Sequence, residues 1–179
     1  YWKTPTNTNF QQVSVILAQV YSNNFQGPMA RCDAACSNYI YVEVKTTSLK
    51  LYKVVAGTAT QIGSTYSTPL FGSMRAGEVV TLEAGVGTVE RSFRVRRGSE
   101  IVISGTDSTS AYGVNNRFAG LIYQMYYSSN FYHPGKLAAW SMADNAPPDY
   151  VGSGFRASKA SGTHSCSNNY NLLPNSFFT

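Results

Sequence analysis

The residues that could carry catalysis are few in this chain. Its two histidines, His133 and His164, stand before Pro134-Gly135 and within a Ser/Gly/Thr segment, so both positions are typical of loops. A serine hydrolase needs a nucleophile beside a histidine and an acid, and Gly152-Ser153-Gly154 is too short for a nucleophile elbow. A glycosidase needs two carboxylates across a cleft, and the nine Asp and Glu residues show no evident pair. The sequence therefore predicts a non-enzymatic protein without a cofactor.

The chain has three cysteines, an odd number, which could form either a short bridge or a long one. Cys32 and Cys36 could close a small loop, or either could bridge to Cys166. The longer bridge is favoured by the chain-entropy model, which assigns about 4–5 kcal/mol to a loop of about 100 residues. Either pairing leaves one cysteine over, as a free thiol or an intermolecular bond. Zinc would need a fourth ligand, for which only His164 is near, and we predict no metal centre there.

Two segments contain several oxygen-bearing side chains that could bind calcium. Asp107 to Asn116 and Asp144 to Asp149 could supply carboxylate, amide and carbonyl oxygens. Neither segment follows the EF-hand pattern, and Asx turns account for the same residue types in loops. We therefore expect these segments to be ordinary loops.

Aromatic residues are the remaining chemical signal, with 13 Tyr, 9 Phe and 2 Trp. Exposed Tyr and Trp side chains stack on sugars and are equally common in protein interfaces. Tyr112, Tyr132 and Trp140 are the candidate ligand-binding residues if they lie in loops. Tyr39 and Tyr41 alternate with apolar residues of one predicted strand. They should therefore lie opposite its buried face, partly exposed or covered by a partner.

The net charge of +5 does not point to nucleic acid. Arg91, Arg94, Arg96 and Arg97 are the only basic cluster, and in a strand they divide between two faces. Coat proteins that package nucleic acid commonly carry a basic arm, yet Lys3 is the only basic residue among the first 30. A viral jelly-roll coat protein is thus the third hypothesis, and we predict no nucleic-acid partner.

Composition indicates an extracellular protein. Only 13% of the residues are charged, against about 25% in an average soluble domain, and hydroxyl and amide side chains take their place. The chain starts at Tyr1, which suggests a removed secretory signal. It has no Asn-x-Ser/Thr sequon for N-glycosylation. No stretch approaches the roughly 18 consecutive apolar residues of a membrane span.

Alternation of apolar and polar residues dominates the chain and predicts strands. Residues 39–45 and 49–55 flank a polar turn and predict a β-hairpin. Similar strands are expected over 79–84, 88–96, 100–104, 118–127, 136–142 and 150–155. Turn signals every 8–12 residues, roughly, predict one all-β domain, a β-sandwich or jelly roll of about 8–10 strands.

The N-terminal part suggests how subunits could assemble. Residues 1–12 read as an extended polar arm ahead of a sandwich domain that spans 13–179. Residues 13–20 form a strand that is apolar on both faces at its middle, which favours a central place in a sheet. Such a strand could be donated to a neighbouring subunit, and head-to-tail contacts of that kind build open filaments. The expected contacts are Val13, Val15, Ile16, Leu17 and Val20.

Two hypotheses of function follow. The first is a self-assembling subunit of an extracellular filament, pilus or surface layer, from which residues 1–20 could be removed while the core stays folded. The second is a secreted carbohydrate- or protein-binding module, lectin-like or C1q-like. The segments Gly77–Leu82 and Phe118–Tyr123 resemble those of C1q/TNF-like jelly rolls in a few residues, although the chain continues well beyond the second segment to Thr179. That resemblance implies a discrete monomer or trimer that binds a glycan or a protein.

Overall fold

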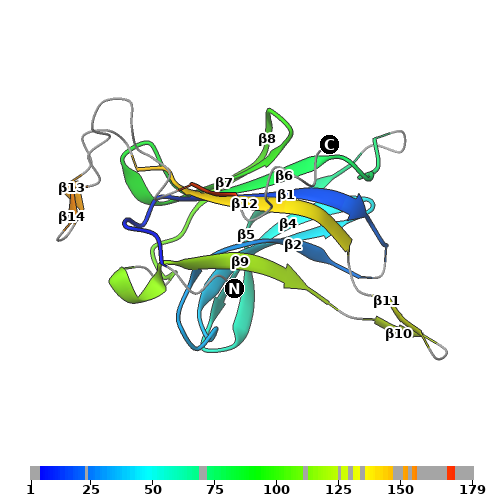
Figure 1. Ribbon diagram of the computed structural model, residues 1–179, viewed down its shortest axis with the longest axis horizontal. Helices are drawn as coiled ribbons and strands as arrows, with labels where there is room; N and C mark the ends of the chain where they lie inside the picture. The colour runs from blue at the N-terminus through cyan, green and yellow to red at the C-terminus, as the bar shows by residue number, and fades with distance from the viewer. Residues whose placement is uncertain are drawn as a thin grey trace.

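Two antiparallel β-sheets face each other in the computed structural model of this chain (Figure 1). The structure describes residues 5–22, 24–68, 72–110, 113–124, 126–128, 131–133, 136–146, 151–152, 155–156 and 169–171. The six-stranded sheet has the order β15-β12-β1-β6-β7-β8, and the five-stranded sheet has the order β5-β4-β3-β2-β9. The fold is therefore the predicted β-sandwich.

The six-stranded sheet is built from β1 (Gln11–Gln19), β6 (Val79–Val86), β7 (Val89–Arg97), β8 (Glu100–Thr106), β12 (Lys136–Asp144) and β15 (Asn169–Asn171). The five-stranded sheet is built from β2 (Gln26–Cys32), β3 (Tyr39–Lys45), β4 (Ser48–Val55), β5 (Thr58–Ser67) and β9 (Phe118–Tyr123). Two short hairpins pair β10 (Tyr126–Ser128) with β11 (Phe131–His133), and β13 (Val151–Gly152) with β14 (Phe155–Arg156). Residues Val114–Asn116 form one turn of 3-10 helix, η1.

The hairpin of β3 and β4 shows how local sequence sets the faces of a sheet. Lys45 pairs with Ser48, so Thr46 and Thr47 form the predicted turn. Val42 lies opposite Leu51, and both side chains are completely buried between the sheets. Because side chains alternate along a strand, the intervening residues must lie on the outer face. The alternation that predicted these strands therefore also predicted which side of each one is buried.

The core between the sheets is made of aliphatic and aromatic side chains from both layers. Its fully buried Val, Leu and Phe members are Val13, Val15, Leu17, Val42, Val44, Leu49, Leu51, Val80, Leu82, Phe93 and Val95. Burial of each such side chain contributes about 1.5–3 kcal/mol. The two sheets are thus held together mainly by residues at alternate positions of β1, β3, β4, β6 and β7.

Strand β1 occupies the middle of its own sheet. It pairs with β12 on one side and with β6 on the other, so that Val15 lies between Trp140 and Val80. The central position expected for an apolar strand is confirmed. A donated strand would leave this place in its own sheet empty, whereas here the strand's own chain fills it. The structure therefore gives strand exchange through Val13–Val20 no support.

Residues 6–10, part of the predicted extended polar arm, pack against the rest of the domain. Thr6, Thr8, Asn9 and Phe10 are buried. The backbone N–H of Thr6 donates to the Arg117 carbonyl at 2.9 Å. The backbone N–H of Thr8 donates to Asp144 Oδ2 at 2.7 Å, and its hydroxyl donates to Asp144 Oδ1. The polar composition of residues 1–12 suggested that they are exposed to solvent. Instead, Thr6 and Thr8 form hydrogen bonds with Arg117 and Asp144, which lie more than a hundred residues further along the chain.

The contact between Thr8 and Asp144 makes a testable prediction for stability. Asp144→Ala should lower the free energy of unfolding by about 1.5–3 kcal/mol, because it removes a charged acceptor of two hydrogen bonds. Thr8→Val in the same background should add only the loss of the acceptor for Phe10 N–H, which lies 3.2 Å from the Thr8 hydroxyl, since that hydroxyl has already lost Asp144. Urea unfolding followed by fluorescence measures both values. Glu100→Ala is the matched control because this carboxylate is exposed, and its effect should stay within about 0.5 kcal/mol.

An aromatic face on the five-stranded sheet

A group of aromatic rings gathers on the outer face of the five-stranded sheet. Tyr39 and Tyr41 come from β3, Tyr52 from β4, and Phe25 from the residue just before β2. Tyr41 pairs directly with Tyr52 in the antiparallel register. The expectation that Tyr39 and Tyr41 lie opposite the buried face of their strand is confirmed. We call these four rings the aromatic face.

The rings of the aromatic face are in mutual contact. Phe25 and Tyr41 stack with centroids 5.7 Å apart and an interplanar angle of 26°. Tyr41 and Tyr52 stack at 5.3 Å and 16°, while Tyr39 lies 5.8 Å from Tyr41 at 48°. Such offset arrangements are favourable for aromatic pairs. Tyr41 at the centre is 7% exposed, whereas the three rings around it are only half-buried.

A layer of apolar side chains supports the aromatic face from the same sheet. Met29 and Val54 are buried against the rings, and Phe118 and Ile122 on β9 are half-buried beside them. Every strand that contributes to this cluster within the described residues belongs to the five-stranded sheet. The rings therefore form part of the outer surface of the sandwich and are separate from the core between its layers.

Charged side chains continue the aromatic face along β3 and β4. Glu43 stands two residues after Tyr41 on the same side of β3 and pairs in register with Lys50. Its Oε1 lies 3.3 Å from Lys45 Nζ and 3.9 Å from Lys50 Nζ. The carboxylate is largely covered, with 10% of its side chain exposed, and both lysines are about three times as exposed. This end of the face thus offers two accessible ammonium groups beside one carboxylate.

The pKa values of the Tyr39 and Tyr41 hydroxyls are raised, so both groups stay protonated over the neutral range. Burial, together with smaller contributions from the nearby Glu43, Tyr52 and Tyr39, raises the pKa of Tyr41 to about 12. Burial also raises the pKa of Tyr39. Neutral phenols can both donate and accept hydrogen bonds. The face therefore combines ring surfaces with hydroxyl, ammonium and carboxylate groups.

The predicted ligand-binding residues Tyr112, Tyr132 and Trp140 are not among the four rings of the aromatic face. Trp140 lies in β12, within the strand expected over 136–142, and not in the loop that its ligand-binding role required. It lies opposite Val15 and packs half-buried against the main core. Tyr132 belongs to the short strand β11, of which only the backbone is described, and Tyr112 lies outside the described residues. Sequence reasoning missed Phe25 and Tyr52. The register of β4 against β3 and the chain path into β2 bring these two rings to Tyr41.

The structure also shows what the cysteines and the arginines of β7 contact. Cys32 and Cys36 are free thiols with Sγ atoms 3.2 Å apart, and Cys166 lies outside the described residues. Arg96 pairs with Glu83 at 2.7 Å, and Arg97 pairs with Glu78 at 2.7 Å. These ion pairs divide the basic cluster of β7 among different partners.

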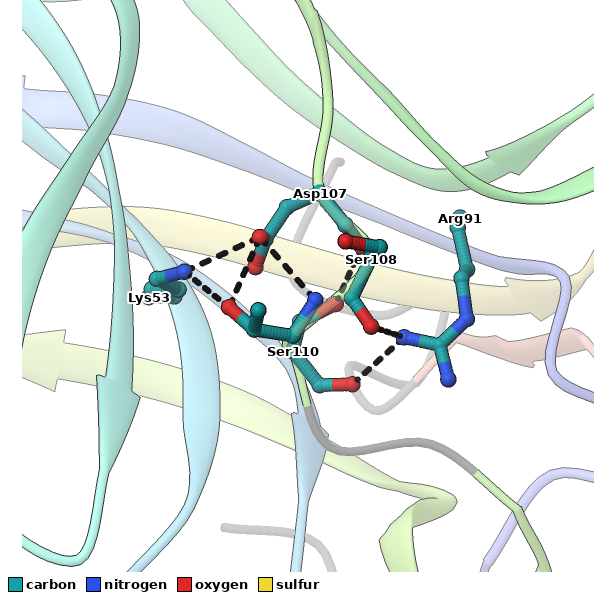
Figure 2. A network of polar contacts seen from close by, with 6 residues as sticks. Lys53, Arg91, Asp107, Ser108 and Ser110 are labelled. Carbon is teal, nitrogen blue, oxygen red and sulfur yellow. Dashed lines mark hydrogen bonds and ion pairs between the residues drawn. The ribbon is translucent and has the colours of Figure 1, made fainter.

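Asp107, a candidate calcium ligand, instead binds a lysine (Figure 2). Its Oδ1 accepts hydrogen bonds from Lys53 Nζ at 2.9 Å and from the Thr109 hydroxyl at 2.9 Å. Close to this loop, Arg91 Nη1 donates to the carbonyls of Ser108 and Ser110. The network joins β4, β7 and the segment after β8, and the ammonium group already neutralises the carboxylate. No cluster of three His, Cys, Asp or Glu suited to a metal occurs within the described residues.

The Asp107 network predicts a loss of stability in acid. Burial alone would raise the pKa of Asp107, but the hydrogen bonds from Lys53 and Thr109 outweigh it and leave the pKa below its ordinary value. Because the unfolded value is about 3.9, this contribution is present above about pH 4 and is lost as the pH falls. Asp107→Asn should therefore show a flatter decline in urea midpoint between about pH 5 and 2. An unchanged slope would contradict this role, and Glu100→Gln serves as the control.

The fold and the aromatic face together define a two-layer β-sandwich with an open ring cluster on one outer sheet surface. The chain belongs to the family described as a domain of unknown function, DUF7257, whose model matches residues 2–148. No curated protein matches it. Among solved structures, it is similar to the carbohydrate binding module CBM66 from Bacillus subtilis, with 21% identity and a TM-score of 0.47. That likeness covers 68% of this chain and 74% of the module. In the described residues, no helix is long and apolar enough to span a membrane.

Proposed function

We propose that this chain is a non-catalytic, extracellular carbohydrate-binding domain that binds its glycan on the aromatic face. One observation carries the proposal, namely a contiguous set of partly exposed rings on an outer sheet surface. A monomeric soluble protein rarely leaves a large apolar patch exposed, and patches rimmed by polar groups commonly mark binding sites. Here the rim consists of Glu43, Lys45 and Lys50.

The chemistry of the face matches that of a sugar. The C–H groups on one side of a pyranose or furanose ring pack against aromatic surfaces, and its hydroxyl groups need hydrogen-bond partners to replace water. The Tyr52 ring supplies the first kind of contact, and the ammonium groups of Lys45 and Lys50 supply the second.

Preorganisation also favours binding. The stack of Phe25, Tyr41 and Tyr52 holds each ring in place before a ligand arrives. Tyrosine and phenylalanine side chains have only about two torsions that binding can fix, so little conformational entropy is lost. The aromatic face can therefore contribute contact area at a low entropic cost.

Screening on a glycan array, followed by titration calorimetry with the polysaccharide identified there, tests the proposal. Tyr52→Ala should weaken binding at least tenfold, which corresponds to about 1.4 kcal/mol. Tyr52→Phe keeps the ring and should bind within about threefold of the parent. Tyr123→Ala is the matched control, because Tyr123 is 57% exposed at the end of β9 and follows Ile122 onto the opposite side of the strand. Equal losses in Tyr52→Ala and Tyr123→Ala, or no glycan bound at all, would contradict the proposal.

Self-assembly is the competing use of the same surface. Partly exposed tyrosine rings are enriched in protein interfaces as well, although strand exchange has no support in the fold. Negative-stain electron microscopy of the native protein distinguishes the two uses. Single particles agree with glycan binding, whereas regular filaments that disperse in Tyr52→Ala would assign the aromatic face to a subunit interface.

A further inference from the structure

The segment between β2 and β3 folds into a tight loop that returns the chain on itself. Asp33 N–H donates to the Asn38 carbonyl at 3.0 Å, and Cys36 N–H donates to the Asp33 carbonyl at 3.0 Å. The Asp33 carboxylate accepts hydrogen bonds from Ser37 N–H at 2.8 Å and from Asn38 Nδ2 at 2.6 Å. The loop is therefore held by its own hydrogen bonds, independently of either thiol.

This loop places two thiols against each other. The Cys32 thiol donates a hydrogen bond to Cys36 Sγ at 3.2 Å. Cys36 adopts a left-handed backbone conformation with φ of 53°, which turns the chain back toward the end of β2. Cys32 is completely buried, and Cys36 is half-buried and packs on the cluster under the aromatic face. The sulfur atoms need to approach by only about 1.2 Å to reach the length of a disulfide bond, about 2.05 Å.

We propose that Cys32 and Cys36 form an intrachain disulfide that encloses residues 33–35 of this loop, at the edge of the aromatic face. The alternative of a long bridge from either residue to Cys166 would have to pull apart two thiols that the fold brings together. The short bridge leaves Cys166 as the unpaired cysteine of the chain.

The two thiols have different roles in the reaction. Cys36 is the more accessible, so its thiolate attacks a small-molecule disulfide, forms a mixed disulfide and releases one thiol. The Cys32 sulfur then displaces the second thiol from Cys36, and the proton of Cys32 passes to that departing group. Two protein thiols are thereby oxidised to one disulfide, and the external disulfide is reduced to two thiols. Burial raises the pKa of the Cys32 thiol, which agrees with Cys36 as the attacking group.

Peptide mapping of the full chain after exposure to oxidised glutathione tests the pairing. The sample is quenched in acid, its free thiols are alkylated under denaturing conditions, and it is digested without reductant. Trypsin cleaves after Arg31 and Lys45, so Cys32 and Cys36 share the peptide 32–45, while Cys166 lies in the peptide 160–179.

The expected product is an unalkylated peptide 32–45, lighter than its reduced form by two hydrogen atoms, together with an alkylated Cys166. Cys166→Ser should leave that product unchanged, whereas Cys36→Ser should abolish it and leave Cys32 alkylated. A peptide 32–45 joined to 160–179, two alkylated thiols, or a glutathione adduct that persists on Cys36 would each overturn the proposal. None of these readouts depends on glycan binding, so failure here is distinguishable from failure of the proposed function.

Discussion

Deleting residues 1–20 should unfold the domain. The deletion removes the whole of β1, the strand that joins β12 to β6 in the middle of the six-stranded sheet. Val13, Val15 and Leu17 are all completely buried, and each contributes about 1.5–3 kcal/mol through burial. Their sum is comparable with the whole stability of a typical domain, about 5–15 kcal/mol. The exposed edges of β12 and β6 would also favour aggregation.

Circular dichroism and two-dimensional amide NMR of residues 21–179 measure this outcome. We expect loss of the cooperative thermal transition and of dispersed amide signals. A synthetic peptide of residues 5–20, added during refolding, should restore both, because it supplies the missing central strand. Ser14→Ala is the control, since Ser14 lies on the outer face and shares one side-chain hydrogen bond with Thr81 at 2.8 Å. If the shortened chain unfolded cooperatively without the peptide, the central role of β1 would be refuted.

Gly27→Ala should have the next largest effect. A methyl group added at Gly27 in β2 would lie 2.0 Å from the carbonyl oxygen of Val42 and 3.0 Å from its carbonyl carbon. Both atoms belong to the backbone of β3, the central strand of the five-stranded sheet. They cannot move away without breaking its pairing with neighbouring strands. Overpacking in a well-packed region costs about 1–3 kcal/mol, and a clash with backbone should exceed that range.

Urea unfolding of Gly27→Ala, compared with Gly98→Ala, measures this effect. Gly98 has a positive φ of 59°, but a methyl group there would have no neighbour within 4 Å. The control therefore shows only the cost of the left-handed conformation, about 1–2 kcal/mol. Gly27→Ala should lower stability by clearly more, or fail to yield soluble protein. Equal effects of the two substitutions would mean that β2 can shift away from β3.

The sequence by itself determined the features that depend on neighbouring residues. Alternation along β3 predicted that Val42 is buried and that Tyr41 faces outward, because a strand's side chains point to opposite faces in turn. Turn residues predicted where β3 ends and β4 begins. Apolar residues on both faces of β1 predicted a central strand. Each of these inferences uses only residues that lie close together in the sequence, which any short window contains.

Only the tertiary structure decided which distant residues meet. Thr8 is satisfied by Asp144, and Trp140 packs into the core beside Val15. The aromatic face itself needs the path of the chain into β2 to bring Phe25 onto Tyr41. Polar residues look the same in sequence whether water or a buried partner satisfies them, and a ring looks the same in a loop or a core. Strand order and register resolve these alternatives, because they depend on how the whole chain buries its apolar surface at once.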